Sequence, residues 1–229
     1  MNQKGSSARV AIIDYGVGNL FSVAQACAHA GMTAEVTSDP ARIQAAGGLI
    51  LPGVGAFGFA MAQLARLKLD TAILAAVDQG KPMLGICLGF QLLFDESTEM
   101  GSARGLGLVP GRVTSLAESL RATGHSGVAR IPHIGWLPIT QPSHAGNRDL
   151  WQGTLLAGTA PGERLYFVHS FHATPTQPEA SLAEADYLGF RYCCAVSRGR
   201  VFGCQFHPEK SATAGLQIYQ RFAAQLTIT

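Results

Sequence analysis

The stretch KPMLGICLGFQLLFDES, residues 81–97, decides which fold this chain is expected to adopt. Its first part, PMLGI (82–86), is a short apolar run that predicts a buried strand, and LGFQLLFDES (88–97) predicts a helix. Cys87 stands at the junction, between two glycines. The stretch alone leaves two interpretations open. Cys87 is either a small core residue, as most free cysteines are, or a thiol presented at a sharp turn.

The second interpretation rests on the glycines. Gly85-x-Cys87-x-Gly89 has the form of the Gly-x-Ser-x-Gly nucleophile elbow, whose glycines allow a tight, strained turn and leave the nucleophile exposed at the carboxyl edge of a sheet. There, the N-terminus of the following helix lowers a thiol pKa from about 8.5. The backbone N–H of Leu88 would point toward a developing oxyanion. The alternative is a buried cysteine in an ordinary strand-to-helix turn.

The rest of the first half alternates between strands and helices. Apolar or alternating runs predict strands, and residues with helical spacing predict helices, over the following segments: strands at 9–16, 33–38 and 47–53, and helices at 19–29, 59–67 and 70–80. This β-α-β-α order predicts an α/β fold, a doubly wound and mostly parallel sheet with flanking helices on both faces.

The second half predicts strands without intervening helices and so an antiparallel strand segment. The predicted strands are 106–116, 165–171, 190–197 and 200–206, the last two forming a hairpin around Arg198-Gly199. A final amphipathic helix is expected from about 212 to 226, and RATGHSGVAR (121–130) is the best candidate for a mobile loop. No repeat or linker divides the chain, so residues 1–229 are expected to form one domain.

Composition narrows the function classes. The chain has 229 residues with a net charge of +2, which does not suggest a nucleic-acid surface. No apolar run approaches the ~18 residues of a membrane span, and MNQKGSSAR lacks a secretory signal's apolar region. The cysteines are odd in number and form no CxxC pair, so reduced thiols and a cytoplasmic location are expected: Cys27, Cys87, Cys193, Cys194 and Cys204.

Metal binding is not expected, and no cofactor is predicted. Cys193 and Cys194 are adjacent on a predicted strand and point to opposite faces, so they cannot share a metal there. His133 in RIPHIGW and His169 in YFVHSF fit hydrogen-bonded structural residues as well as ligands.

A base for Cys87 is available in HPE, 207–209. His207 follows the apolar strand RVFGCQF and so stands at its carboxyl end. With the period of two of a strand, His207 and Glu209 project to the same side. Glu209 can then orient the imidazole while His207 takes the cysteine proton, as in a catalytic triad. Alone, HPE would fit a surface His-Pro turn; together with the elbow it favours the triad.

The loop LPGVGAFG, 51–58, has two interpretations. Gly53-x-Gly55-x-x-Gly58 has the form of the dinucleotide fingerprint, but it follows an internal strand and lacks an acid at the end of the next one. It can instead supply backbone N–H groups, from Val54 and Gly55, to an oxyanion hole. A nucleotide-binding module therefore remains the non-enzymatic alternative. The loop YGVGN (15–19) lacks a third glycine and is expected at an interface.

Together, GICLGFQ, QFHPEKS and LPGVGAF resemble the class I (triad) glutamine amidotransferase family, whose fold is flavodoxin-like. Three more stretches, IDYGVGNL (13–20), IPHIGW (131–136) and YFVHSF (166–171), are similar to the glutaminase subunits of imidazole glycerol phosphate synthases, from histidine biosynthesis. The resemblance spans nearly the whole chain.

The resemblance implies a reaction and a set of site residues. Cys87 attacks the side-chain amide of L-glutamine, giving a glutamyl thioester and ammonia, with His207 as base and Glu209 as its orienter. The remaining roles it implies are an oxyanion hole formed by Gly53, Val54, Gly55 and Leu88, contacts of Gln91 and Glu99 with the amide and amino ends of glutamine, and a substrate strand at His169, Ser170 and Phe171.

The resemblance also implies a partner, a (β/α)8-barrel cyclase bound as a heterodimer, with Asn19, His133 and Trp136 at the interface. The sequence itself contains no Walker loop, so another chain is expected to use the ammonia. We expect the oxyanion hole to be completed, or its loop reoriented, only when the partner is bound and carries its nucleotide.

Two positions depart from the family pattern. Leu137 stands where Asn is more usual, and Phe171 where Tyr is common. They leave open the alternative that this chain is a paralogue that feeds ammonia to a related sugar-amidating enzyme. A stand-alone cysteine hydrolase of the same fold is a further alternative, which gives Gln91 no obvious task.

Overall fold

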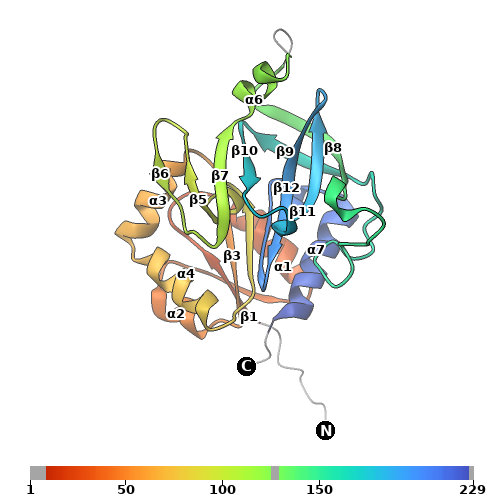
Figure 1. The fold of residues 1–229 in the computed structure, drawn as a ribbon. Coiled ribbons are helices and arrows are strands. Elements are labelled where there is room, and N and C mark those ends of the chain that lie inside the picture. Colours follow the sequence, from red (N-terminus) through yellow and green to blue (C-terminus); the bar gives the residue numbers. More distant parts are fainter. Residues whose placement is uncertain (1–8, 125–128, 227–229) are drawn as a thin grey trace.

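The computed structural model describes residues 9–124 and 129–226. In the first half, strands and helices alternate as predicted (Figure 1). The elements are β1 (Arg9–Ile13), α1 (Leu20–His29), β2 (Thr33–Thr37), α2 (Pro40–Ala45), β3 (Gly48–Gly53), α3 (Phe57–Arg66), α4 (Leu69–Asp78) and β4 (Met83–Cys87). The strands β2, β1, β3 and β4 lie side by side in that order and are all parallel. The predicted doubly wound α/β sheet is confirmed.

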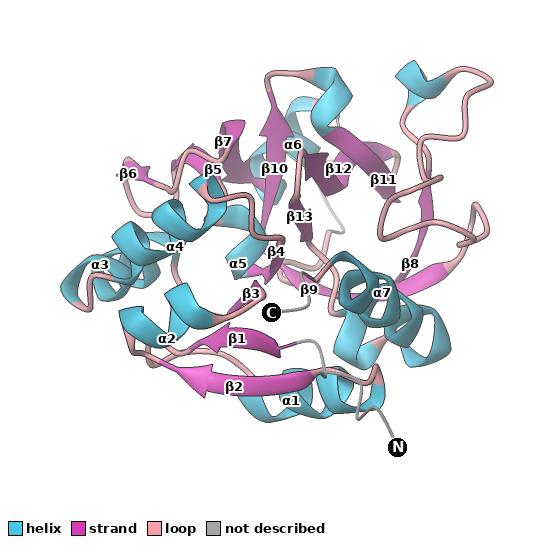
Figure 2. Ribbon diagram, turned by 90° about the horizontal axis from the view of Figure 1, so that it is seen from below, coloured by secondary structure: helices cyan, strands magenta, loops and turns pink. Residues whose placement is uncertain are grey.

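Both faces of this sheet are covered because both faces of its strands are apolar. In β1, Val10 and Ile12 pack against α1 and the last helix, α7 (Ala212–Gln225). Ala11 and Ile13 point the other way, into the core formed with α2, α3 and α4. Figure 2 shows these two groups of helices on opposite sides of the sheet. A strand buried on both faces is typical of a parallel sheet.

The second half extends the sheet with mostly antiparallel strands. β12 (Phe190–Arg198) and β13 (Val201–Cys204) form the predicted hairpin, with Gly199 at φ 60° in its turn. β13 also pairs in parallel with β4, which joins the two halves. From β12 the sheet continues through β10 (Phe171–Pro175), β7 (Val109–Ser115), β5 (Phe94–Ser97) and β6 (Ala103–Arg104).

A second arm leaves the sheet at the same strand, β12. It runs through β11 (Ser181–Tyr187), β8 (His133–Thr140) and β9 (Arg164–His169), each antiparallel to its neighbour. β9 then turns at Ser170 into β10, so the strand predicted over 165–171 is two strands in two arms. This division opens the space in which the site described below lies.

The helix predicted over 88–97 is wrong in its second half. Helix α5 is a single turn, Leu88–Gln91, and the chain then enters β5. A longer helix would need the carbonyl groups of residues 92–94 as acceptors for residues 96–98. The backbone N–H groups of Leu106, Leu108 and Gly107 take those carbonyls instead, at 2.8–3.2 Å. A tertiary contact therefore overrides the helical pattern.

Other elements were not predicted or differ in extent. The unpredicted ones are α2, β6, β8, β10, β11, helix α6 (Leu116–Ala122) and the short 3-10 turns Ser143–Ala145, Pro178–Ala180 and Pro208–Lys210. The strand expected over 106–116 begins only at Val109. Of the loop expected over 121–130, the first residues belong to α6, and residues 125–128 lie outside the described part of the chain. None of the described helices is long and apolar enough to span a bilayer.

Candidate active site

Cys87 ends β4 in a backbone conformation that is unusual for a residue with a side chain. Its φ is 56° and its ψ is −111°, and such positive φ values cost energy and concentrate at functional sites. The two flanking glycines allow neighbouring backbone segments to approach closely. A Cβ on Gly89 would lie 1.7 Å from the carbonyl oxygen of Leu51, and one on Gly85 would lie 2.7 Å from that of Gly89. The strain of the turn is therefore carried by Cys87, and the glycines let α5 pack directly against β3.

His207 and Glu209 reach Cys87 from the end of β13. The imidazole Nδ1 lies 2.8 Å from Glu209 Oε1, and both side chains are buried. Two further hydrogen bonds anchor the segment: His207 N donates to Tyr166 O at 2.8 Å, and Ser211 Oγ donates to His207 O at 2.7 Å. Because Nδ1 faces Glu209, Nε2 is the ring nitrogen that remains for Cys87, whose thiol donates in this structure to Val168 O at 3.6 Å.

The electrostatics of this group favour a charged imidazole. Burial alone would lower the pKa of His207, but its interactions with the neighbouring Cys87 and Glu209 outweigh burial and raise the pKa to about 10. These neighbours stabilise the imidazolium that forms when neutral His207 takes the proton of Cys87, so they favour a proton transfer from the thiol to the imidazole. The residues predicted as a triad are therefore brought to one site, although Cys87 and His207 are 120 positions apart in the chain.

A cavity of about 210 Å³ opens in front of Cys87. Its size suits a small polar molecule such as an amino acid, being below the range of drug-sized pockets. It brings together the predicted site residues Val54, Gly55, Cys87, Leu88, Gln91, Glu99, His169, Ser170, Phe171 and His207, with Pro132 and Val168 in addition. Of the predicted catalytic and oxyanion residues, Gly53 and Glu209 are not among those that line it.

The glycine loop after β3 lies beside the nucleophile. Gly55 has φ 97°, which favours glycine. At Gly53, a Cβ would lie 2.2 Å from the hydroxyl of Tyr15, which itself donates to Pro52 O at 2.9 Å. Val54 and Gly55 line the same cavity as Cys87, the place that an oxyanion loop requires.

Three of the predicted substrate residues are themselves held by hydrogen bonds. Gln91 Nε2 donates to Phe171 O at 3.2 Å and to Gln205 Oε1 at 2.9 Å. Glu99 Oε2 accepts from the backbone N–H of Phe57 at 2.7 Å, at the first turn of α3. His169 contacts Phe171 O through Nδ1 at 2.9 Å and the Tyr192 hydroxyl through Nε2 at 3.0 Å.

His169 is placed to support the wall of the cavity. Burial is the main cause that lowers the pKa of His169, to about 3, so the ring is neutral. Since a carbonyl oxygen only accepts, Nδ1 carries the proton and Nε2 accepts from Tyr192. Both ring nitrogens are thereby occupied within the protein.

Sequence reasoning missed Gln205 and Tyr15. Gln205 is fully buried and donates from Nε2 toward Cys87 Sγ at 3.9 Å. The available signal was a lone amide in the apolar strand RVFGCQF, two residues before His207 and so on the same face. No comparable signal marked Tyr15, whose contact with the glycine loop depends on the pairing of β1 with β3.

The predicted interface residues differ in their accessibility. Asn19 caps α1 by accepting from Ser22 N at 3.4 Å, and Trp136 is 42% exposed on β8. His133 is buried, with its ring 4.3 Å from that of Tyr187. The His133 side chain therefore lies beneath the surface, whereas that of Trp136 reaches it.

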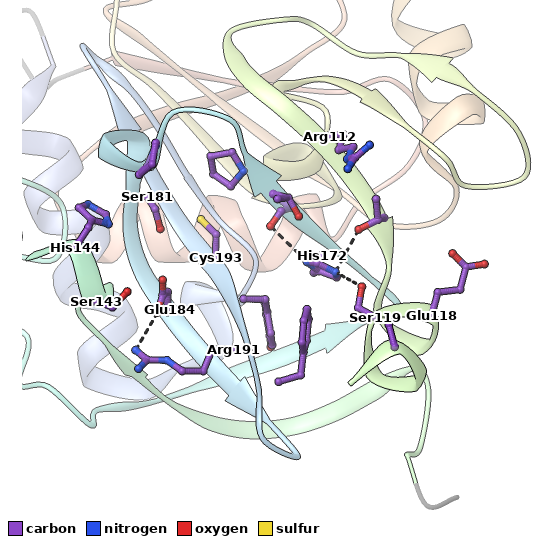
Figure 3. A pocket seen from close by; sticks show the side chains of 18 residues that line it. Arg112, Glu118, Ser119, Ser143, His144, His172, Ser181, Glu184, Arg191 and Cys193 are labelled. Atoms are coloured by element: carbon purple, nitrogen blue, oxygen red, sulfur yellow. Dashed lines mark hydrogen bonds and ion pairs between the residues drawn. The ribbon is translucent and has the colours of Figure 1, made fainter. Parts of the chain in front are cut away.

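A larger cavity, of about 870 Å³, lies between β7, β10 and α6 on one side and β11 and β12 on the other (Figure 3). Its only sulfur is that of Cys193, whose pKa burial raises to about 12. His172 is neutral there, since burial lowers its pKa to about 4, and its Nε2 contacts Ser119 Oγ at 2.8 Å. The Cys193 thiol of this cavity is therefore not activated as a nucleophile. Among residues 9–124 and 129–226, no cluster of three or more His, Cys, Asp or Glu is placed to hold a metal ion.

Comparison with known proteins identifies the class. A family model described as "Glutamine amidotransferase class-I" matches residues 11–226. The chain therefore belongs to the class I glutamine amidotransferases. Two solved structures show the same fold: PurLQS from Thermotoga maritima, with a TM-score of 0.70 and 20% identity over 95% of this chain and 98% of that one, and a glutamine amidotransferase with a TM-score of 0.66 and 16% identity over 94% and 98%.

Relatives narrow the family further. The imidazole glycerol phosphate synthase subunit HisH of Methylococcus capsulatus is 46% identical over 93% of this chain and 94% of the relative. The protein of the same name from Moorella thermoacetica is 43% identical over 93% of each. The chain thus belongs to the HisH family of glutamine amidotransferase subunits.

Proposed function

We propose that this protein hydrolyses L-glutamine to glutamate and ammonia through a Cys87–His207–Glu209 triad. The observation that carries the proposal is the position of Cys87, which stands at positive φ in a small cavity that His207 also lines, with His207 paired to buried Glu209. A cysteine with only a structural role would need neither the strained backbone nor the paired base.

The reaction follows from this arrangement. His207 takes the proton of Cys87, and the sulfur attacks the side-chain amide carbon of glutamine. Backbone N–H groups of Leu88 and of the loop at Val54 and Gly55 stabilise the oxyanion. The C–N bond then breaks as His207 returns the proton to the leaving nitrogen, which gives ammonia and a glutamyl thioester. Water, deprotonated by His207, attacks the thioester and releases glutamate and the thiol.

Gln91 and Glu99 are proposed to bind the amide and amino ends of glutamine. Both line the cavity, and Glu99 already accepts a backbone N–H at the start of α3. A carboxylate there suits the ammonium group of an amino acid. Ser170 and Phe171 line the same cavity, next to His169.

We further propose a (β/α)8-barrel cyclase as the partner that consumes the ammonia, in a cytoplasmic heterodimer of histidine biosynthesis. The relatives carry the name of a synthase subunit. Apolar side chains left exposed in this chain support a covering partner: Val54 of the glycine loop at 46%, and Ile134 and Trp136 of β8 at 61% and 42%. Residues 1–229 act in this proposal as one amidotransferase domain, with no cofactor of their own.

The test is glutamate release with and without the cyclase and its ribonucleotide. We expect glutamine turnover when the cyclase and its ribonucleotide are present, and far slower turnover without the cyclase, because contact of the cyclase with Val54 completes the oxyanion loop. Equal, fast hydrolysis without a partner would refute the coupling. Glutamate release that survives Cys87→Ala would refute the mechanism.

A further inference from the structure

The amide of Gln91 can adopt only one orientation in this site. Its Nε2 lies 3.2 Å from Phe171 O, and a backbone carbonyl can accept but not donate, so the nitrogen must face it. The second N–H points to Gln205 Oε1 at 2.9 Å. Both amide hydrogens are thus used within the protein. The carbonyl oxygen is the group that Gln91 can offer to a bound molecule.

The same constraint fixes the orientation of Gln205. Because its Oε1 accepts from Gln91, its Nε2 is the end that faces Cys87 Sγ, at 3.9 Å. Gln205 is fully buried, and its backbone N–H is held by Cys194 O at 2.9 Å, so the side chain has a rigid base. Hydrogen bonds therefore connect Phe171 O with the nucleophile: Gln91 donates both to Phe171 O and to Gln205, and Gln205 donates toward Cys87.

We propose that Gln205 is a positioning residue of the glutaminase, which holds Gln91 with its oxygen toward glutamine and donates an N–H to the sulfur of Cys87. An acceptor at Gln91 attracts the N–H groups of glutamine and repels a carboxylate, so it favours the substrate over the product glutamate. The donor from Gln205 stabilises the thiolate. The inference rests on the proposed function, from which it takes the substrate.

Two substitutions separate the two tasks of Gln205. Gln205→Met keeps the volume and burial but removes both hydrogen bonds. Gln205→Glu keeps an acceptor for Gln91 and replaces the donor to Cys87 by an oxygen. Gln44→Met is the matched control, since Gln44 is a half-buried glutamine of α2 that donates to Ala72 O at 2.7 Å, outside the site.

Steady-state glutamate release with the cyclase measures the first task. We expect Gln205→Met to raise KM for glutamine about tenfold, and Gln205→Glu to keep KM within about threefold of the wild type. Gln44→Met should leave KM unchanged. A wild-type KM in Gln205→Met contradicts the first task.

The second task of Gln205 is measured by the rate at which iodoacetamide alkylates Cys87. This rate is followed by mass spectrometry from pH 5 to pH 10, about five units, which is enough to span a thiol titration. It needs neither glutamine nor partner. Both variants should move the pH of half-maximal alkylation upward by about one unit, and Gln44→Met should not. If Gln205→Met does not fold, as judged by its thermal transition, Gln205→Glu decides alone. A wild-type profile in Gln205→Glu overturns the contact with sulfur.

If the wild type releases no glutamate with its partner, the proposed function fails, while the alkylation comparison still decides the role of Gln205.

Discussion

Cys87 and Cys193 are almost equally buried, with exposed fractions of 7% and 8%, and each lines a cavity. Their surroundings differ. Cys193 lies within β12, where its thiol donates to Ala195 O at 3.3 Å and burial raises its pKa to about 12. Cys87 is the last residue of β4, stands at positive φ, and lines its cavity together with His207, whose pKa it helps to raise. Lining a cavity does not make a thiol reactive. A charged side chain beside it and a turn that exposes the sulfur do.

The largest expected effect comes from removing each of the two thiols in turn. Cys87→Ala should lower kcat for glutamate release at least about 10⁴-fold, since a triad nucleophile has no substitute. Cys193→Ala should keep kcat, because that thiol lines the larger cavity and not the one that holds Cys87 and His207. The measurement is glutamate release in the presence of the cyclase. Similar losses in both variants would remove the distinction between the two cysteines.

Next in size is the loss of the carboxylate behind His207. Glu209→Gln should lower kcat about 10²- to 10⁴-fold, because the neutral amide no longer stabilises the imidazolium. The same assay measures it. Glu118→Gln, an exposed change on α6, is the control and should retain full activity. Retained activity in Glu209→Gln would show that His207 needs no charged partner.

The turn that presents Cys87 can be tested through its glycines. Gly89→Ala should destabilise the protein by about 3 kcal/mol or more, since its Cβ would lie 1.7 Å from Leu51 O and a backbone atom cannot easily move away. Gly58→Ala, within α3, meets only Ala103 at 3.6 Å and should be neutral or stabilising. Denaturant unfolding of both variants measures the difference. Equal stabilities would contradict the close packing of α5 on β3.

The smallest effect concerns pH. The pKa of His207 is raised from 6.5 to about 10 in the folded protein, so its paired, charged form contributes stability that is fully present below about pH 6.5 and is lost as the pH rises toward 10. The stability difference between wild type and His207→Asn should therefore shrink by about 1–2 kcal/mol over that window, since burial offsets part of the pairing. Urea unfolding at several pH values measures it; a constant difference would mean that His207 is neutral in the folded state.

The two halves of the chain also differ in how well their structure could be predicted. In the first half, strands such as β1 and β3 were predicted to within a few residues, because strand, turn and helix signals are local. In the second half, β8, β10 and β11 were not predicted, since each is defined by its partner strands in the two arms of the sheet. The helix over 88–97 failed for the same reason: the carbonyls of residues 92–94 bond to a distant segment.

The site shows the same division. Local spacing alone placed Cys87 at a strand-to-helix junction and put His207 and Glu209 on one side of a strand end, because turn glycines and the period of two are properties of a short segment. Only the tertiary structure decided that these groups meet, that Cys87 itself adopts the strained φ of 56°, and that Gln205 lies against its sulfur. Those contacts join β4 to β13, whose pairing depends on the whole sheet. The orientation of the Gln91 amide is decided in the same way, by a carbonyl group eighty residues along the chain.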